Sequence, residues 1–426
     1  MASADIKQND SRYRPWQIKI LLATWLAYAG YYFCRKPFYV TKVSISGALG
    51  IDSFGLAQLG TAYLVAYMAG QFSSAFFGRK LGPKLLLLAG IMISIVSTFF
   101  FGISNSFWTV MLFMSLNGLA QGTGWPGCIG SLAFWFRRKQ RGSVLGLWST
   151  CYQIGPVLAT LLASFLLGRA GWRWSFFGGS MVLLAVWFVV LVVHPNRPED
   201  AGLPPLHDED EVTDKPEGVG REKLGWDRDV MLTIMIMGLI YFCIKFLRYA
   251  LWSWLPWLLN RNFMMSEADA GYLSVIFDIC GFAGVIAAGF LSDRIFKGKR
   301  AMLSFVMLGL MTVSFFILYF LGSANLAVFT IAIAFAGFML FGPDSLLSGV
   351  GAIDVGSKEG ALSAAGIING MGSIGPIFQE QLVGWMYRRY NQDLLPILIM
   401  LVIIAAVSAV LTLLLWLRSR KGLANV

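Results

Sequence analysis

Long apolar runs dominate the pattern of hydrophobic and polar positions along this chain. Runs of about 20 residues or more recur about twelve times, and each is long enough as a helix to cross a hydrocarbon core about 30 Å thick. We expect these helices over residues 16–39, 55–77, 82–103, 106–135, 142–168, 172–194, 229–259, 268–292, 300–322, 325–352, 358–386 and 393–417. The pattern therefore predicts an all-α membrane protein with twelve transmembrane helices.

One long polar segment, Pro195 to Trp226, interrupts the apolar runs and is rich in Asp, Glu, Lys and Pro. It divides the expected helices six and six. We predict an N-terminal six-helix half over residues 1–194, a cytoplasmic linker over 195–227 and a C-terminal six-helix half over 228–426.

The composition agrees with a membrane protein, because 57% of the residues are hydrophobic and only 13% are charged. A soluble domain is nearer a quarter charged. The net charge of +11 could suggest nucleic-acid binding, but the positive residues lie in short loops between the apolar runs, where orientation signals belong. The first residues lack the pattern of a cleaved secretory signal, so we expect the first apolar run to be retained.

The distribution of Lys and Arg predicts the orientation in the membrane. With both termini placed inside, 24 of the 34 Lys and Arg residues fall in inner segments and 6 in outer loops. This asymmetry predicts cytoplasmic termini and a multi-pass protein of the cell (inner) membrane.

Residues that commonly carry catalysis or bind metals are few. The five cysteines all lie within apolar runs and form no CxxC pair, and the two histidines, His194 and His207, stand apart from them. We therefore expect buried thiols and predict no enzyme activity, no cofactor and no metal site.

The remaining 4 of the 34 cations fall inside predicted spans: Arg35, Lys36, Lys245 and Arg248. A cation near the centre of a bilayer costs about 2.5–3.5 kcal/mol on insertion scales, so its presence indicates a function. The alternative for Arg35 and Lys36 is that their side chains reach the interface from a helix end.

An internal repeat favours the functional interpretation. The glycine- and charge-rich turns at 75–84 and 289–300, the Pro126 and Pro343 motifs, and the pair Arg35 and Arg248 are separated by 214, 217 and 213 positions, respectively. Three features at nearly one spacing predict two halves related by a pseudo-two-fold axis along the membrane normal. Arg35 and Arg248 should then lie at similar depth on opposite walls of a central cavity, with Tyr32 and Lys245 at matching positions.

Several motifs in these halves resemble those of a known family. They are Tyr31-Tyr32-x-x-Arg35-Lys36-x-Phe38, Gln121-Gly-x-Gly-Trp-Pro126, Leu247-Arg248-Tyr249 and Phe341-Gly-Pro343. The six-plus-six plan is similar to the major facilitator superfamily, and the motifs resemble its organophosphate:phosphate antiporters, including the glycerol-3-phosphate and hexose-phosphate transporters. The resemblance implies that Arg35 and Arg248 clamp a substrate phosphate and that inorganic phosphate is exchanged for a phosphorylated metabolite.

The chain departs from the family pattern at several positions. Gln71 stands where the family has a lysine, Tyr152 where the glycerol-3-phosphate transporter has a histidine, and Ser253 where an aspartate is usual. Lys245 is extra relative to the bacterial glycerol-3-phosphate pattern and resembles a lysine of the animal sugar-phosphate exchangers. These differences bear on which metabolite is carried.

The candidate site residues fall into three sets. A guanidinium offers a planar fork of donors that matches phosphate, and a tyrosine hydroxyl can line a cavity at little desolvation cost. The predicted substrate-binding residues are Arg35, Arg248, Lys245, Tyr32, Tyr67, Tyr152 and Gln71. For Asp278 we expect an ion pair with Lys36 or Lys245, and for Asp293 and Arg294 a role in a cytoplasmic gate. Asp344 and Glu380 are further intramembrane acids that could set selectivity or couple transport to protons.

Two other functions remain open. A transporter-like sugar-phosphate sensor would keep the same arginines, and a proton-coupled organic-anion symporter would use Asp278, Asp344 and Glu380. The expected partners are a small phosphorylated anion, inorganic phosphate and membrane lipid, with no nucleic acid, and the chain is expected to act as a monomer.

Overall fold

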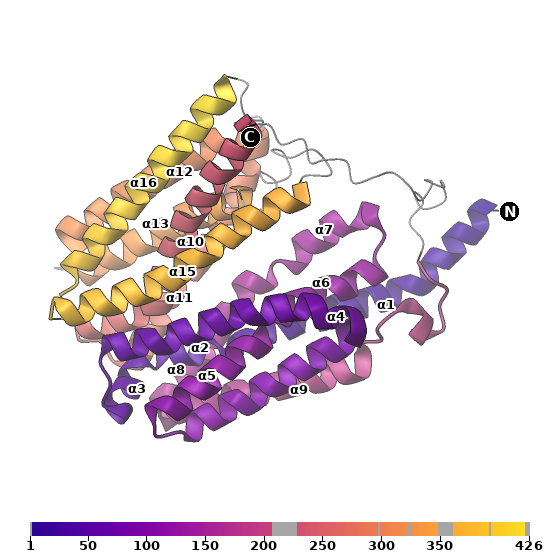
Figure 1. The fold of residues 1–426 in the computed structure, drawn as a ribbon, viewed down its shortest axis with the longest axis horizontal. Helices are drawn as coiled ribbons and strands as arrows, with labels where there is room; N and C mark the ends of the chain where they lie inside the picture. The colour runs from indigo at the N-terminus through magenta and orange to yellow at the C-terminus, as the bar shows by residue number, and fades with distance from the viewer. Residues whose placement is uncertain are drawn as a thin grey trace. The chain divides into compact units, whose positions relative to one another are not determined.

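The computed structural model describes residues 2–206, 228–296, 299–322, 325–347, 361–391 and 393–421, and within these ranges all regular structure is helical. Long helices run side by side through each part of the chain (Figure 1). Helices of this kind agree with the prediction from the apolar runs and are expected of a chain that satisfies its backbone groups in lipid.

The first part of the chain folds into a series of helices that ends before the polar segment. Its elements are α1 (Ala2–Tyr31), η1 (Tyr32–Cys34), α2 (Lys36–Val40), α3 (Lys42–Leu49), α4 (Ser53–Ile103), α5 (Phe107–Gln121), α6 (Gly124–Trp135), α7 (Arg138–Trp148), α8 (Cys151–Ala170), α9 (Trp172–Val193) and η2 (Pro198–Ala201).

The second part follows the polar segment. Its elements are α10 (Arg228–Phe263), α11 (Glu267–Arg294), α12 (Arg300–Ile317), the π-helix η4 (Leu318–Gly322), α13 (Leu326–Ser345), α15 (Ala361–Arg389) and α16 (Leu395–Arg420).

Each of the twelve predicted apolar runs coincides largely with helix over those of its residues that the structure describes. Eight of the described helices are long and apolar enough to cross a membrane by length and composition alone. The other four runs contain polar residues or helix breaks, at Arg35, Gln71, Gln121 and Glu380. The runs at 55–77 and 82–103 differ from expectation in one respect, since α4 continues through the turn between them with a kink at Gly82 (φ 75°) before Pro83.

The first membrane run is broken where its cations lie. Pro37 occupies the first turn of α2, and a proline inside a continuous helix would lose one hydrogen bond and clash with the preceding turn. The chain instead leaves α1 at Tyr31, makes the short 3₁₀ turn η1 and restarts at Lys36. Arg35 is the residue at the break, and its backbone N–H donates to Tyr32 O at 3.0 Å.

A second break separates α5 from α6. α5 ends at Gln121, the chain passes through Gly122 and Thr123, and α6 begins at Gly124 with Pro126 in its first turn. Broken helices at membrane depth are characteristic of transporter binding sites, where freed backbone and side-chain groups line the site.

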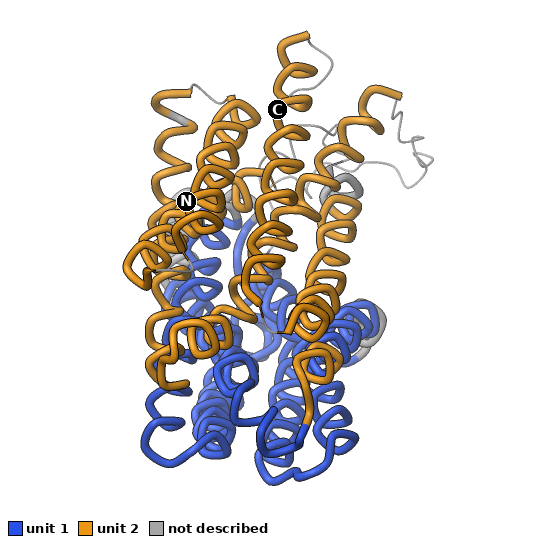
Figure 2. Tube along the Cα trace, turned by 90° about the vertical axis from the view of Figure 1, so that its left-hand side faces the viewer, with its two compact units in different colours: residues 1–50, 59–218 blue, residues 51–58, 219–426 orange. Residues whose placement is uncertain are grey.

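The chain divides into two compact units (Figure 2). Unit 1 comprises residues 1–50 and 59–218, and unit 2 comprises residues 51–58 and 219–426. The first turns of α4 therefore belong to unit 2, where Ser53 Oγ donates to Gly384 O of α15 at 3.0 Å and Arg388 lies 3.5 Å from Asp52. Most of the predicted linker 195–227 falls on residues 207–227, which lie outside the described residues, and its boundaries stay a prediction.

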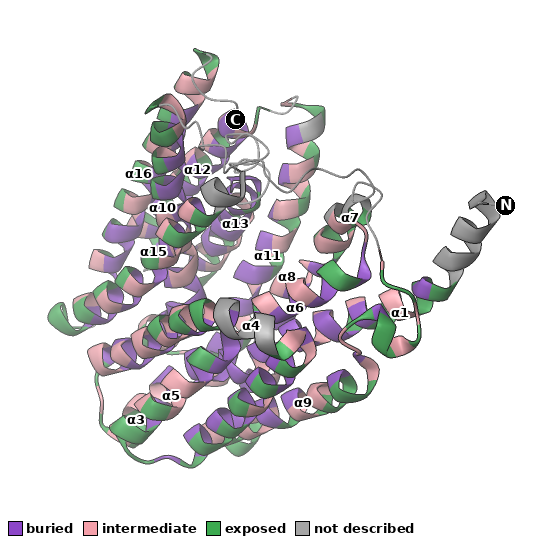
Figure 3. Cartoon of the chain, turned by 45° about the vertical axis from the view of Figure 1, so that its right-hand side comes forward, coloured by how far each residue is buried: buried purple, intermediate pink, exposed green. Residues whose placement is uncertain are grey.

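Large apolar side chains are exposed along the outer faces of the helices (Figure 3). Examples are Phe72 on α4, Met181 and Val192 on α9 and Phe320 on η4. In water such surfaces would be unfavourable, but lipid tails are as apolar as these side chains, so the pattern fits a surface that faces the hydrocarbon core.

Candidate functional site

Arg35 lies at the break after α1 and is buried, with 7% of its surface exposed. Its Nε donates to Gln121 Oε1 at the end of α5, at a distance of 2.9 Å. No carboxylate of the described residues contacts it, and the groups that surround its guanidinium are neutral. An uncompensated cation at this depth is a strong attractor for an anion.

Three tyrosine rings surround the Arg35 guanidinium. Its Cζ lies 5.0 Å from the ring centre of Tyr32, 5.4 Å from that of Tyr63 and 5.1 Å from that of Tyr67. The electron-rich faces of the rings attract a cation without neutralising it. Of the predicted substrate-binding residues in unit 1, Tyr32 and Tyr67 thus lie beside Arg35.

The remaining predicted residues of unit 1 join the same aromatic cluster. The Tyr28 ring contacts those of Tyr152 and Tyr32, with centres 4.9 Å and 6.0 Å apart. The hydroxyls of Tyr28 and Tyr67 are 3.5 Å apart, and Gln71 Nε2 donates to Tyr67 Oη at 3.4 Å. The structure therefore brings Arg35, Tyr32, Tyr67, Tyr152 and Gln71 into one region of unit 1.

In unit 2, Arg248 on α10 has a carboxylate partner. Its Nη1 donates to Asp344 Oδ2 on α13, and its guanidinium lies over the Phe341 ring, 4.1 Å from the ring centre. The only acid in the span of Arg248 is Asp229 at its start, and the partner comes instead from a helix about a hundred residues further along. The two predicted phosphate-binding arginines therefore differ: Arg35 has neutral partners and Arg248 an acidic one.

Lys245 lies one turn before Arg248 on α10. Its Nζ donates to Asn369 Oδ1 at 3.0 Å and is 3.5 Å from Ser373 Oγ, both on α15, and it lies 4.8 Å from the Tyr241 ring centre. These partners are neutral, and Asp278 is not among them. Lys245 thus lies near the Arg248–Asp344 pair with neutral hydrogen-bond partners of its own.

Glu380 on α15 is held by neutral donors of α10. Its Oε2 accepts hydrogen bonds from Ser253 Oγ at 2.8 Å and Trp254 Nε1 at 3.1 Å, and the residue is 1% exposed. Ser253, which stands where the family has an aspartate, therefore contacts an acid of the neighbouring helix.

The residues predicted for ion pairs and gating are more dispersed. Lys36 and Asp278 are both buried, in units 1 and 2, respectively. Arg294 at the end of α11 is exposed and lies over the Phe290 ring at 5.4 Å, whereas the side chain of Asp293 lies outside what the structure describes. The predicted pairs and the gate stay predictions.

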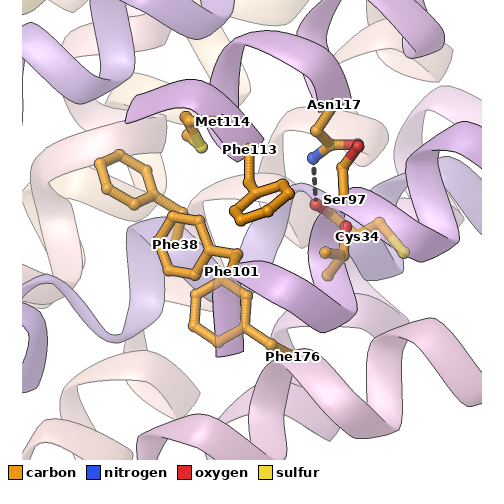
Figure 4. A pocket seen from close by; sticks show the side chains of 9 residues that line it. Cys34, Phe38, Ser97, Phe101, Phe113, Met114, Asn117 and Phe176 are labelled. Atoms are coloured by element: carbon orange, nitrogen blue, oxygen red, sulfur yellow. Dashed lines mark hydrogen bonds between the residues drawn. The ribbon is translucent and has the colours of Figure 1, made fainter. Parts of the chain in front are cut away.

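A small cavity lies beside the break in the first membrane run (Figure 4). Its volume is about 10 Å³, which is room for about one water molecule and too little for a phosphate ester. Asn117 Nδ2 donates to Cys34 O at its edge, at 2.8 Å. The lining residues are Cys34, Phe38, Ser97, Thr98, Phe101, Phe113, Met114, Asn117 and Phe176.

Sequence reasoning missed the neutral polar residues that hold the cations. Gln121 belongs to a recognised motif, but its contact with Arg35 could not be read from it. Asn369 and Ser373 are four residues apart in a predicted span, a spacing that places both on one face of a helix. That spacing of two polar residues in an apolar run was the available signal.

Comparison with known proteins gives a consistent result. A family model described as Major Facilitator Superfamily matches residues 20–379 and 237–425. The membrane sensor protein UhpC of Salmonella typhimurium is 29% identical over 392 residues, covering 89% of this chain and 87% of the relative. The glycerol-3-phosphate transporter of Bacillus subtilis is 25% identical, with 91% and 90% covered, and sugar phosphate exchanger 3 of Bos taurus is 28% identical, with 89% and 90% covered.

Solved structures show the same fold. A bacterial homolog to the human lysosomal transporter Spinster, in an inward-facing and unoccupied conformation, matches with a TM-score of 0.77. The match covers 96% of this chain and 98% of that chain at 17% sequence identity. At this identity the likeness concerns the fold alone.

Proposed function

Because this chain belongs to the major facilitator superfamily, a superfamily of membrane transporters and not of enzymes, we propose that it is a secondary transporter working by alternating access. Its substrate is a phosphorylated small metabolite of the glycerol-3-phosphate, hexose-phosphate or phosphoglycerate type, and inorganic phosphate is exchanged for it. Relatives named as glycerol-3-phosphate and hexose phosphate transporters and as sugar phosphate exchangers support this substrate class.

The observation that carries the proposal is the burial of Arg35 among neutral groups. A permanently charged guanidinium is buried at a helix break, bonded through Nε to a neutral amide and flanked by three tyrosine rings. A buried charge of this kind is costly in a membrane unless an anion binds to it. Arginine can bind two phosphate oxygens through a pair of N–H donors.

The other proposed site residues have supporting roles. Arg248 and Lys245 provide further cations from unit 2, and Tyr32, Tyr67, Tyr152 and Gln71 offer hydroxyl and amide groups to the organic part of the substrate. Lys36, Asp278, Asp293 and Arg294 act in ion pairs and gating, and Asp344 and Glu380 influence selectivity. The chain lies in the cell (inner) membrane with both termini cytoplasmic, in contact with lipid and as a monomer.

A sensor is the second candidate, and the similarity to a membrane sensor protein favours it specifically. A sensor would bind the ester at the same cations but would carry little flux. A proton-coupled organic-anion symporter draws support from the buried acids Asp344 and Glu380, and its transport would not depend on internal phosphate.

The proposal is tested by exchange in reconstituted vesicles loaded with phosphate, offered a panel of phosphate esters outside. We expect uptake of at least one ester that requires internal phosphate. Net uptake into phosphate-free vesicles at the same rate would contradict exchange, and collapse of uptake when the proton gradient is dissipated would favour the symporter. Binding of an ester with no flux would favour the sensor.

Arg35→Lys and Arg248→Lys test the role of the guanidinium, because lysine keeps the charge and loses the fork. We expect each substitution to lower the exchange rate by about tenfold or more, because each removes one charge-assisted hydrogen bond to phosphate. Arg418→Lys is the matched control, since Arg418 Nη2 pairs with Asp229 Oδ1 at 2.9 Å near the first residues of α10 and the last of α16. Full activity in both site variants would refute the arginine clamp.

A further inference from the structure

Gln121 is the most heavily hydrogen-bonded side chain near Arg35. It is 1% exposed at the end of α5. Its Oε1 accepts hydrogen bonds from Arg35 Nε at 2.9 Å and from Tyr63 Oη at 2.8 Å. A guanidinium only donates, so the amide oxygen must face Arg35 and the orientation of the amide is settled.

The other end of the amide is anchored independently. Gln121 Nε2 lies within hydrogen-bonding distance of Tyr31 O at 3.2 Å, Asn117 Oδ1 at 3.0 Å and Ser94 Oγ at 3.3 Å. Ser94 in turn donates to Asn117 Oδ1 at 2.6 Å. The acceptor that Gln121 offers to Arg35 is therefore fixed by α1, α4 and α5 together.

The hydrogen bond to Gln121 occupies the Nε side of the Arg35 guanidinium and leaves the Nη1 and Nη2 groups without a hydrogen bond to the part of the chain that the structure describes. Among the described residues, the side chain of Arg35 makes a single hydrogen bond, the one from Nε to Gln121. Its Nη1 and Nη2 groups have no hydrogen-bond partner there, and its electrostatic neighbours are tyrosines. The end of the fork that could hold two phosphate oxygens is thus available and fully charged.

We propose that Gln121 is the positioning residue of Arg35. Its neutral oxygen takes the Nε–H and directs the Nη groups to the ligand, without cancelling the charge that attracts phosphate. A carboxylate of the same shape would hold the guanidinium equally well but would compete with the substrate as its counterion. The inference rests on the proposed phosphate site and names a residue that the site requires beyond its direct contacts.

Gln121→Glu tests this, because it keeps the shape of the side chain and adds a negative charge beside Arg35. The assay is binding of inorganic phosphate to the purified full chain in detergent, followed from about pH 8 to about pH 6, together with phosphate exchange in vesicles. At the upper pH we expect the affinity for phosphate to be about 10–100-fold below that of the unmodified protein. The reason is that the new carboxylate neutralises the charge with which Arg35 would bind phosphate. The deficit should persist over this range, because the neighbouring guanidinium favours the ionised form of the new carboxyl.

The titratable side chains that face Gln121 are Arg35 and Tyr63, and those that surround Arg35 are Tyr28, Tyr32, Tyr63 and Tyr67. The affinity at each pH is therefore compared with that of the unmodified protein, which shares these groups and the titration of phosphate itself. Gln17→Glu is the matched control, because Gln17 Nε2 donates to Trp135 O at 2.9 Å in the same unit, far along α1. It should bind phosphate as the unmodified protein does at every pH.

Tyr63→Phe provides a second variant if Gln121→Glu fails to fold. It removes one anchor of the amide oxygen and keeps both the ring beside Arg35 and the Arg35–Gln121 bond. We expect KM for phosphate to rise about threefold to tenfold with the maximal exchange rate unchanged, as for the loss of one buried hydrogen bond.

Several outcomes would overturn the inference. Unchanged phosphate affinity in folded Gln121→Glu would do so, as would an equal loss of affinity in the control Gln17→Glu. Unchanged KM in Tyr63→Phe would contradict the anchoring of the amide. If the unmodified protein binds neither phosphate nor an ester, the proposed function itself fails, and that result is separate from a failure confined to the variants.

Discussion

At the scale of single residues, the two arginines predicted to bind phosphate are held by opposite chemistry. Arg35 in unit 1 is bonded to a neutral amide, whereas Arg248 in unit 2 is paired with Asp344. Lys245, one turn away, is bonded to neutral groups. Lys245 in unit 2 therefore resembles Arg35 in unit 1, because the hydrogen-bond partners of both cations are neutral.

Asp344 should therefore discriminate against substrates that carry a second anionic group. In Asp344→Asn, Arg248 loses the negative charge of Asp344, so the affinity for a carboxylated ester such as a phosphoglycerate should rise relative to that for glycerol-3-phosphate. We expect the ratio of their affinities to shift by about tenfold, typical of one charge-assisted contact. Competition of each ester against phosphate binding measures that ratio.

Asp229→Asn is the control for this prediction. Asp229 also pairs with an arginine of unit 2, Arg418, but near the opposite end of α10 from Arg248. It should leave the ratio unchanged. A ratio in Asp344→Asn equal to that of the unmodified protein would show that Asp344 does not set the charge of the substrate.

His194, which follows the membrane segment of α9, should make the protein sensitive to acid. Ser131 Oγ donates to Gly127 O, so His194 Nε2 must be the donor in its 2.8 Å bond to Ser131 and Nδ1 carries the lone pair. Burial lowers the pKa of His194 from 6.5 to about 4. Between these values the unfolded chain binds the proton and the folded chain does not, so stability falls as the pH drops from about 6.5 to about 4, by on the order of 3 kcal/mol.

Thermal unfolding in detergent at several pH values checks this. His194→Gln should flatten the dependence on pH, because glutamine offers a donor and does not titrate. His207→Gln, at the other histidine of the chain, should keep it. A steep acid response that survives in His194→Gln would assign the effect to other groups.

At the scale of elements, the site depends on helix breaks and on the close approach of neighbouring helices. Arg35 and Gln121 each lie where a membrane run is interrupted ahead of a proline, Pro37 and Pro126, respectively. The sequence indicates both breaks, since proline removes a helical hydrogen bond. How closely α5 lies against α4 depends instead on glycines with no room for a side chain.

Gly122→Ala should separate these two helices. A Cβ added at Gly122 would lie 2.6 Å from Gly70 C and 2.7 Å from Tyr67 O, both backbone atoms of α4. Backbone cannot move aside as a side chain can, so we expect a loss of stability of about 1–3 kcal/mol, typical of overpacking, together with weaker phosphate binding because Gln121 is adjacent. Thermal unfolding and phosphate binding measure the two effects.

Gly146→Ala is the matched control on α7, where an added Cβ meets nothing within 4 Å. It should be neutral or stabilise the helix by up to about 1 kcal/mol, the difference in helix propensity. Equal behaviour of the two variants would mean that the α4–α5 approach tolerates a methyl group.

At the scale of the whole molecule, the distribution of cations predicts the orientation in the membrane. Ser106, exposed directly before α5, lies at the outer end of its membrane run in this orientation, and Glu199, exposed in η2, lies on the inner side. In intact cells a membrane-impermeant thiol reagent should label Ser106→Cys at once and Glu199→Cys only after permeabilisation. Four of the five native cysteines are buried, which keeps the background low. The reverse pattern would place both termini outside.

By itself the sequence determined the membrane class, the helices and the family, and it identified the cations. Each of these follows from local pattern: long apolar runs, prolines and charges that are costly in lipid. The residues that hold those cations could not be predicted in this way. Arg35 is bonded to a residue 86 positions away and Arg248 to one 96 positions away.

Only the tertiary structure decided which groups meet these arginines, because the packing of α5 beside the break after α1, and of α13 beside α10, brings them together. Asp344 was recognised as an intramembrane acid, but its pairing with Arg248 depends on that packing. Gln121 appeared as part of a motif, and its place against Arg35 required the break at Gly122. Charge at a position is a property of the sequence, whereas its compensation depends on neighbours that folding supplies.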